Sequence, residues 1–205
     1  MRQVHHDGSN LAKLHQKNDV KRLLHPIDIP GQQNTMPFKI NADGVIVGCN
    51  HHNVTDLGGT DLNTMIGFSL DAGIISQTMI RSMNTGVNPA GDVVGYYFGN
   101  PEGIASTRAE WSYLIRNGLM RWFQFPGSLA TMANDINSSG TIIGVHRTGL
   151  SGPNQFHGFV MEDGEMTSID APGATETRAF GISAGGYIVG YYLDSTGYHG
   201  FLLSI

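Results

Sequence analysis

A nine-residue segment recurs four times along this 205-residue chain, and this repetition constrains the fold more than any other feature. Each copy has an apolar residue, then Asn or Ser, a short turn that contains glycine, and a run of residues that ends in a second glycine. The copies begin at Ile40, Val87, Ile136 and Ile182, and are therefore 47, 49 and 46 residues apart. Asn and Ser bond their own backbone in turns, and β-branched runs favour strands. Each segment therefore predicts a strand, a tight turn and a second strand within a repeat architecture.

Two further elements recur between these segments in a fixed order. The first is a short aromatic strand, clearest at residues 157–161 and 199–203 and looser at 66–70 and 111–115. The second ends in Pro-Gly at residues 30–31, 126–127 and 172–173. Asn117-Gly118 and Asp163-Gly164 separate the two elements in the middle repeats, and both pairs are typical of hairpin turns. Each repeat therefore predicts four strands joined in a meander.

The predicted fold is all-β, a small four-bladed β-propeller with four-stranded blades. We place a polar N-terminal arm at residues 1–20 and a single propeller domain at residues 21–205. The last repeat lacks a fourth strand, whereas residues 21–30 resemble a fourth strand that has no blade of its own. We expect the N-terminal strand to close the last blade, which would remove exposed sheet edges. An open β-solenoid or a β-sandwich is the alternative.

The most regular repeats resemble a known family. Residues 158–182, with Ile188-Val189-Gly190-Tyr191-Tyr192 and His199-Gly200-Phe201-Leu202, are similar to the HAF repeat. That repeat is found in bacterial, mostly extracellular proteins of largely unknown role. The resemblance covers about residues 22–205. It implies a propeller-like fold and assigns no catalytic residue.

Composition excludes several classes of partner and cofactor. A net charge of −5 argues against nucleic-acid binding, and no apolar run approaches the length of a membrane span. The single cysteine, Cys49, excludes an intrachain disulfide and a cysteine-based zinc site. We expect no metal and no cofactor, and a small molecule as the partner. The N-terminus lacks a signal-peptide pattern, which predicts a cytoplasmic protein if Met1 is the native start, or a secreted one whose signal has been removed.

Residues that break the repeat are the candidates for a site, since residues kept in every blade serve the scaffold. All the long connections fall at one end of the predicted blades, where we place an axial mouth. The predicted lining of this mouth is Met36, Met83, Met132 and Arg178, with Thr177 and the equivalent hydroxyl residues one step earlier. The next strand contributes Tyr97, His146 and Tyr192 to the same mouth.

These residue types indicate acid–base chemistry on a small molecule. Arg178 would anchor an anionic group, and His146 would transfer a proton, with Tyr97 and Tyr192 as orienting donors. His51 is a further candidate, and a metal site that joins it or His52 to His146 and Asp56 or Asp61 is the weaker alternative to a site without metal. The alternatives are structural: Arg178 forms an ion pair with Glu176, and His146 makes its hydrogen bonds within the core. Trp111 suits stacking on a sugar or an aromatic ligand, or simply fills the core.

Two other sets of residues have predominantly structural interpretations. Lys39 and Asp135 occupy equivalent positions in opposite blades, so they could meet at the axis as a plug or, alternatively, as an acid–base pair. His157 and His199 recur before Gly-Phe and are expected to hydrogen-bond a neighbouring backbone. The favoured function is a cofactor-independent isomerase, lyase or cyclase. The alternatives are a non-catalytic ligand- or carbohydrate-binding propeller and a protein-interaction scaffold.

Overall fold

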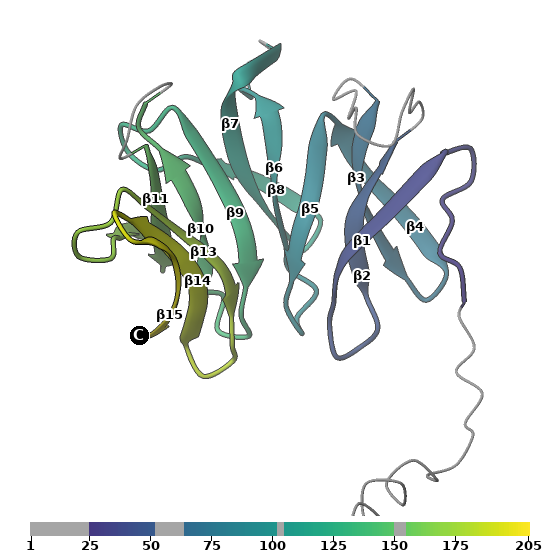
Figure 1. Ribbon diagram of the computed structural model, residues 1–205. Coiled ribbons are helices and arrows are strands. Elements are labelled where there is room, and N and C mark those ends of the chain that lie inside the picture. Colours follow the sequence, from purple (N-terminus) through teal and green to yellow (C-terminus); the bar gives the residue numbers. More distant parts are fainter. Residues whose placement is uncertain (1–24, 52–63, 102–104, 150–154) are drawn as a thin grey trace, which may run out of the picture.

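The computed structural model describes residues 25–51, 64–101, 105–149 and 155–205, and within these ranges the chain is built from β-strands without helices (Figure 1). The strands form four antiparallel sheets in the order of the sequence. The first sheet contains β1 (Asn34–Ile40), β2 (Ile46–His51), β3 (Met65–Asp71) and β4 (Ile74–Ile80). The second contains β5 (Ser82–Val87), β6 (Val93–Gly99), β7 (Ala105–Arg116) and β8 (Leu119–Phe123).

The third and fourth sheets continue this meander. The third contains β9 (Ala130–Ile136), β10 (Ile142–Arg147), β11 (Phe156–Glu162) and β12 (Glu165–Ile169). The fourth contains only β13 (Glu176–Ile182), β14 (Tyr187–Asp194) and β15 (Gly197–Ser204). Each sequence repeat therefore produces one sheet, as predicted. No helix long and apolar enough to cross a membrane occurs in the part of the chain that the structure describes.

The second glycine of the repeated segment has a packing reason. A Cβ atom built on Gly95 would lie 2.0 Å from the Met83 carbonyl oxygen and 2.6 Å from the Tyr113 hydroxyl. Gly144 and Gly190 meet the equivalent carbonyl oxygen and an aromatic ring in the same way. The aromatic residue of the third strand thus lies over the glycine of the second strand, and any larger side chain there would collide with the backbone of the first strand.

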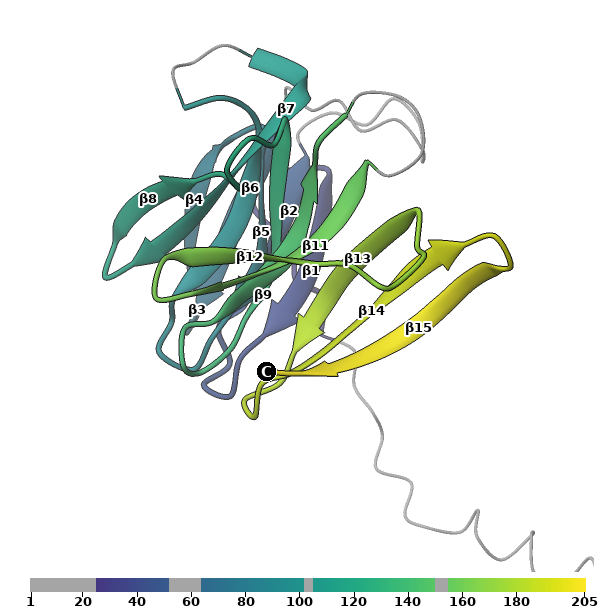
Figure 2. The ribbon, with the colours of Figure 1, turned by 90° about the vertical axis from the view of Figure 1, so that its left-hand side faces the viewer.

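Apolar layers fill the spaces between successive sheets. Between the first two sheets, Val47 packs with Val87 and Val93. Between the second and third, Val94 packs with Ala133, Ile136 and Ile142, and between the third and fourth, Ile143 and Val160 pack with Ala179, Ile182 and Ile188. The sheets follow one another around an axis, with the first strand of each on the inside (Figures 1 and 2).

The first strand of every sheet carries a bulge that helps to join the sheets. The pairing skips one residue in each case, at Phe38, Thr85, Asn134 and Phe180. Two of these bulged side chains bond the next sheet: Thr85 donates to the Ala133 carbonyl at 2.7 Å, and Asn134 donates to the Ala179 carbonyl at 2.7 Å. A bulge turns a side chain out of the regular alternation. Here it directs a donor across the gap between sheets.

The predicted closure of the last blade by residues 21–30 is not confirmed. Residues 25–30 contain no strand, and no described pairing joins them to β15. In Figure 1 they lie beside β1 (Asn34–Ile40), on the opposite side of the molecule from β15. Residues 21–24 fall outside the described part of the chain. The segment does, however, enter β1 through a turn that the repeat uses elsewhere, with Ile29 N–H donating to Thr35 Oγ1 at 3.1 Å.

Candidate ligand-binding groove

The hydroxyl residues predicted to line the axial mouth serve the scaffold in the structure. Thr177 is buried, and its Oγ1 accepts a hydrogen bond from Ala171 N–H at 3.1 Å. Thr131 accepts the same bond from Phe125 N–H at 2.9 Å. Each hydroxyl fixes the connection by which the chain enters a new sheet. The neighbouring side chains of Met36, Met83 and Met132 are partly buried on the same strands.

Arg178 has partners within its own sheet, which agrees with the structural alternative, an ion pair with Glu176. Its guanidinium forms an ion pair with Glu176, and Tyr191 donates to the same carboxylate at 3.2 Å. The guanidinium carbon also lies 3.9 Å from the centre of the Phe156 ring. A ligand anion would have to compete with Glu176 for this cation.

His146 is buried in the third sheet between two rings. It stacks on Phe125 with 3.7 Å between ring centroids and on His157 at 5.1 Å, and its Nε2 lies 3.3 Å from Ser168 Oγ. Burial lowers the pKa of His146 to about 4, with the charge of His157 lowering it further and that of Asp170 opposing. The imidazole is therefore neutral at pH 7.

The other predicted catalytic side chains are not brought to His146. Tyr97 packs edge-on against Trp122 in the second sheet, and Tyr192 stacks on His199 in the fourth. Trp111 lies opposite Tyr97 in the pairing of β6 with β7. His51 is buried in the first sheet, with its Nε2 3.6 Å from Cys49 Sγ.

The metal interpretation of His51 has no support in the described residues. Asp56 and Asp61 lie outside them, and within them no three His, Cys, Asp or Glu side chains are placed to hold a metal ion. Burial raises the pKa of Cys49 to about 12, so its thiol stays protonated and contributes no thiolate ligand.

Lys39 and Asp135 meet at the axis. Lys39 Nζ lies 2.7 Å from Asp135 Oδ2, and the same oxygen accepts Ile182 N–H at 3.1 Å. Asp135 is 2% exposed. One carboxylate thus joins the first strands of the first, third and fourth sheets, which is the geometry of a plug.

The recurring histidines bond carboxylates rather than the backbone that the sequence suggested. His157 Nδ1 lies 2.7 Å from Asp170 Oδ1, and His199 Nε2 lies 3.2 Å from Asp194 Oδ1. Ser168 donates to the other oxygen of Asp170 at 2.7 Å. These contacts link strands within one sheet and agree with a structural role.

A groove of about 610 Å³ lies instead between the second and third sheets, at the end of the molecule that carries the tight turns. One wall consists of β7 (Ala105–Arg116) and β8 (Leu119–Phe123), and the other of the turns at residues 139–142 and 161–164. The lining residues are Leu114, Arg116, Arg121, Trp122, Phe123, Ser139, Gly140, Thr141, Ile142, Met161, Glu162, Asp163 and Gly164. Apolar and charged side chains of both signs therefore meet there.

Trp122 belongs to the strand that lines the groove, and its ring packs on the face of that strand that is turned toward the first sheet. Tyr97 and Tyr113 each contact it edge-on, with ring centroids 5.9 and 5.7 Å away. Tyr113 is fully buried, and its hydroxyl oxygen lies 2.6 Å from Asn84 Oδ1 and 2.8 Å from the Met83 carbonyl oxygen, one of which accepts its single proton. The indole therefore stands on a rigid base.

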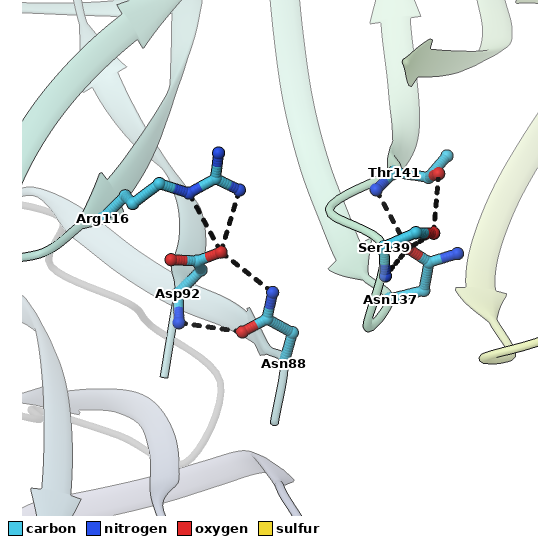
Figure 3. Close-up of polar contacts among 6 residues, drawn as sticks. All are labelled: Asn88, Asp92, Arg116, Asn137, Ser139 and Thr141. Atoms are coloured by element: carbon cyan, nitrogen blue, oxygen red, sulfur yellow. Dashed lines mark hydrogen bonds and ion pairs between the residues drawn. The ribbon is translucent and has the colours of Figure 1, made fainter. Parts of the chain in front are cut away.

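Arg116 is fixed at the rim by one carboxylate. Its Nε and Nη2 lie 3.1 and 2.8 Å from Asp92 Oδ2, and Asn88 Nδ2 donates to that oxygen at 3.0 Å (Figure 3). These hydrogen bonds raise the pKa of Arg116 above its ordinary value. A Cβ atom on Gly140, across the groove, would lie 3.1 Å from Arg116 Nη2. The absence of a side chain there leaves room for the guanidinium.

The opposite turn is fixed by Asn137. Its Oδ1 accepts Ser139 N–H at 3.1 Å, Ser139 O–H at 2.8 Å and Thr141 N–H at 2.9 Å (Figure 3). Asn88 makes the equivalent bond to Asp92 N–H at 2.9 Å. Both turns that flank the groove are thus locked by the asparagine of the repeat.

Sequence reasoning missed Trp122, Arg121 and Arg116, although the signal was present. The strand pairing aligns Trp122 with Ser168 of the third sheet and Gln77 of the first, so the tryptophan breaks the repeat. Asp92, the partner of Arg116, likewise stands where the third repeat has Thr141. The predicted site residues came mainly from the first two strands of each repeat, whereas the fourth strand differs more between repeats.

Comparison with known proteins identifies the class of fold to which the chain is similar. No family model matches the sequence, and no curated protein is significantly similar to it. Among solved structures, the chain is similar to the β-propeller domain of the Trilobed protease from Pyrococcus furiosus, which is described as having an open velcro topology. The TM-score is 0.51 at 12% identity, over 77% of this chain and 46% of that one. The likeness shows a β-propeller fold, and the chain spans less than half the length of that propeller. A closed ring of four blades stays a prediction.

Proposed function

We propose that this protein is a non-catalytic ligand-binding propeller whose groove between the second and third sheets binds a carbohydrate. The observation that carries the proposal is the groove of about 610 Å³, whose lining combines the aromatic ring of Phe123 with the charged residues Arg121, Glu162 and Asp163. An aromatic ring suits one face of a sugar, whose C–H groups pack on the ring while its hydroxyls stay in reach of polar groups.

The charges around Trp122 favour a neutral, hydroxyl-rich ligand over a simple anion. Arg121 and Arg116 stand on one wall, and Glu162 and Asp163 on the other. Arg116 is already neutralised by Asp92. An isolated anion would meet carboxylates as well as guanidiniums, whereas vicinal hydroxyls can donate to the former and accept from the latter.

The test uses Trp122 as its own reporter. The chain has two tryptophans, so Trp111→Phe leaves Trp122 as the only indole. Titration of this variant with a panel of neutral and acidic oligosaccharides should change its fluorescence with at least one neutral sugar. Arg121→Ala should then weaken binding of that sugar by about tenfold, measured calorimetrically. Leu119→Ala, at an exposed position of the same strand that does not line the groove, is the matched control. A panel that leaves the indole unperturbed, or full binding by Arg121→Ala, would refute the proposal.

Acid–base catalysis is the second candidate, and one observation favours it. The neutral imidazole of His146 lies 3.3 Å from Ser168 Oγ, and Ser168 and His157 share Asp170. An isomerase, lyase or cyclase reaction would need this group as its base. His146→Gln should abolish such turnover and leave sugar binding in the groove intact. Loss of both together would indicate a folding defect instead.

A further inference from the structure

Two apolar sheet faces lie uncovered at the two ends of the series of sheets. On the fourth sheet, Phe180, Val189 and Leu202 are 48, 49 and 68% exposed. We call these three residues the trailing face. On the first sheet, Ile40 is 60% exposed, and the nearby Pro37 is exposed as well. We call these two residues the leading face.

The repeat shows that both faces are built to be covered. Val189 is the fourth member of a set whose other members, Val47, Val94 and Ile143, are all fully buried against the next sheet. Ile40 is the first member of a set whose other members, Val87, Ile136 and Ile182, are at most 8% exposed. At three interfaces within this chain, residues equivalent to the trailing face pack on residues equivalent to the leading face. The two exposed faces are therefore complementary to each other.

The surroundings of Gly200 also show that no described sheet packs on the fourth sheet. A Cβ atom on its equivalent in the third sheet, Gly158, would lie 3.1 Å from Ile169 of the outer strand and 3.7 Å from Ala179 of the next sheet. A Cβ atom on Gly200 would meet only the carbonyl oxygen of Gly190, at 3.9 Å. Among the described residues, the fourth sheet thus has neither an outer strand nor a following sheet.

The segment before β1 has the features of that outer strand. Ile29 N–H bonds Thr35 Oγ1 at 3.1 Å, as Ala171 N–H bonds Thr177 Oγ1 at 3.1 Å. By this alignment Asp28 stands where Asp170 stands, one residue before Ala171. Asp170 lies 2.7 Å from His157, and the fourth sheet carries His199 at the position of His157. Asp28 is therefore matched to a histidine on the fourth sheet.

The two faces do not cover each other within one chain. The first and fourth sheets do not pack face to face, and Figures 1 and 2 show them splayed apart. We infer that a second copy of this chain covers them, with the leading face of each copy on the trailing face of the other around a two-fold axis. Both ends of both copies are then satisfied at once, and eight sheets close into one ring. The match to less than half of a longer propeller supports a ring of about this size.

The first test measures the mass of the full chain in solution by sedimentation and light scattering. A dimer, twice the 22.1 kDa of one chain, is expected. Val189→Asp and Ile40→Asp should each convert it to a folded monomer, because each places a charge in both interfaces, which the two-fold axis makes identical. Both residues are exposed within one chain, so the fold should survive. Leu119→Asp, at an equally exposed site outside both faces, should remain dimeric. A wild-type monomer at all concentrations would overturn the inference.

A disulfide between the positions of Val189 and Ile40 identifies which chain covers the trailing face. Val189→Cys and Ile40→Cys chains are prepared separately, mixed and oxidised. A covalent dimer of one chain with the other supports the inference. A double variant that instead cross-links within a single chain indicates a self-closed four-sheet ring and overturns it, as would a ladder of longer polymers. Asp28→Lys should weaken the wild-type dimer, and His199→Asp should restore it in the same chain if the two residues meet between copies.

Discussion

At the scale of single residues, His146 makes the fold sensitive to acid. Its pKa is about 4 in the folded chain, against an ordinary 6.5. Between these values the unfolded chain binds a proton that the folded chain does not, so stability is fully present above about pH 6.5 and is lost as the pH falls toward 4. Denaturant unfolding should show a loss of ~2 kcal/mol across this window. His146→Gln should flatten that part of the profile. An unchanged slope in the variant would assign the acid sensitivity to other groups.

The axial ion pair also makes a prediction at this scale. Lys39→Ala leaves the buried Asp135 carboxylate with backbone amides as its only partners among the described contacts, and should lower the free energy of unfolding by ~3 kcal/mol. Adding Asp135→Asn should recover part of that loss, because it removes the uncompensated charge and keeps an acceptor for Ile182 N–H. Chemical denaturation of the two single variants and the double variant measures the coupling. Strictly additive losses would mean that the pair is not the plug.

At the scale of one element, the turn between β9 (Ala130–Ile136) and β10 (Ile142–Arg147) depends on one side-chain oxygen. Asn137 Oδ1 accepts three hydrogen bonds there. Asn137→Ala should cost ~1 kcal/mol or more, since each lost bond contributes about that much. The same variant should distort the groove wall and weaken the binding of any ligand in the groove. Ser138→Ala, in the same turn but exposed, is the control and should change neither property.

At the scale of the whole molecule, a ring shared by two copies makes stability depend on protein concentration. Mass action raises the stability of a dimer by ~1.4 kcal/mol for each tenfold increase in concentration. Because the unfolding entropy is that of two chains, this corresponds to a rise of about 1.5–3 °C in Tm per decade. Scanning calorimetry over two decades measures the rise. Val189→Asp should unfold at one temperature at every concentration, and a concentration-independent wild type would argue for self-closure.

The strands, their order and their register could be predicted, because one local pattern fixes them. The pairings of Thr35 with Asn50, Thr131 with His146 and Thr177 with Tyr192 place the first two strands of each repeat in the alignment that the sequence indicated. The contact of Lys39 with Asp135 followed from the same alignment. All of this information lies within a single repeat.

The closure of the ring and the groove could not be predicted from the pattern within a single repeat. Closure depends on the angle between successive sheets. The packing of Val47, Val94 and Ile143 against the next sheet determines this angle, and the alternation of residues along a strand does not predict it. The groove forms where Arg121 and Phe123 of one sheet lie beside the turn of the next sheet that contains Ser139. Its shape depends on the sizes of side chains from two repeats, whereas sequence reasoning had placed the site on the long connections.

Folding kinetics should reflect the contrast between the meander and the axis. Within a sheet, every strand pairs with its sequence neighbour, so sheets of low contact order can form quickly and independently. The bond from Lys39 to Asp135 spans 96 residues and requires three sheets to be in place. It is therefore expected to form after the rate-limiting step. Lys39→Ala should then accelerate unfolding and leave the refolding rate almost unchanged.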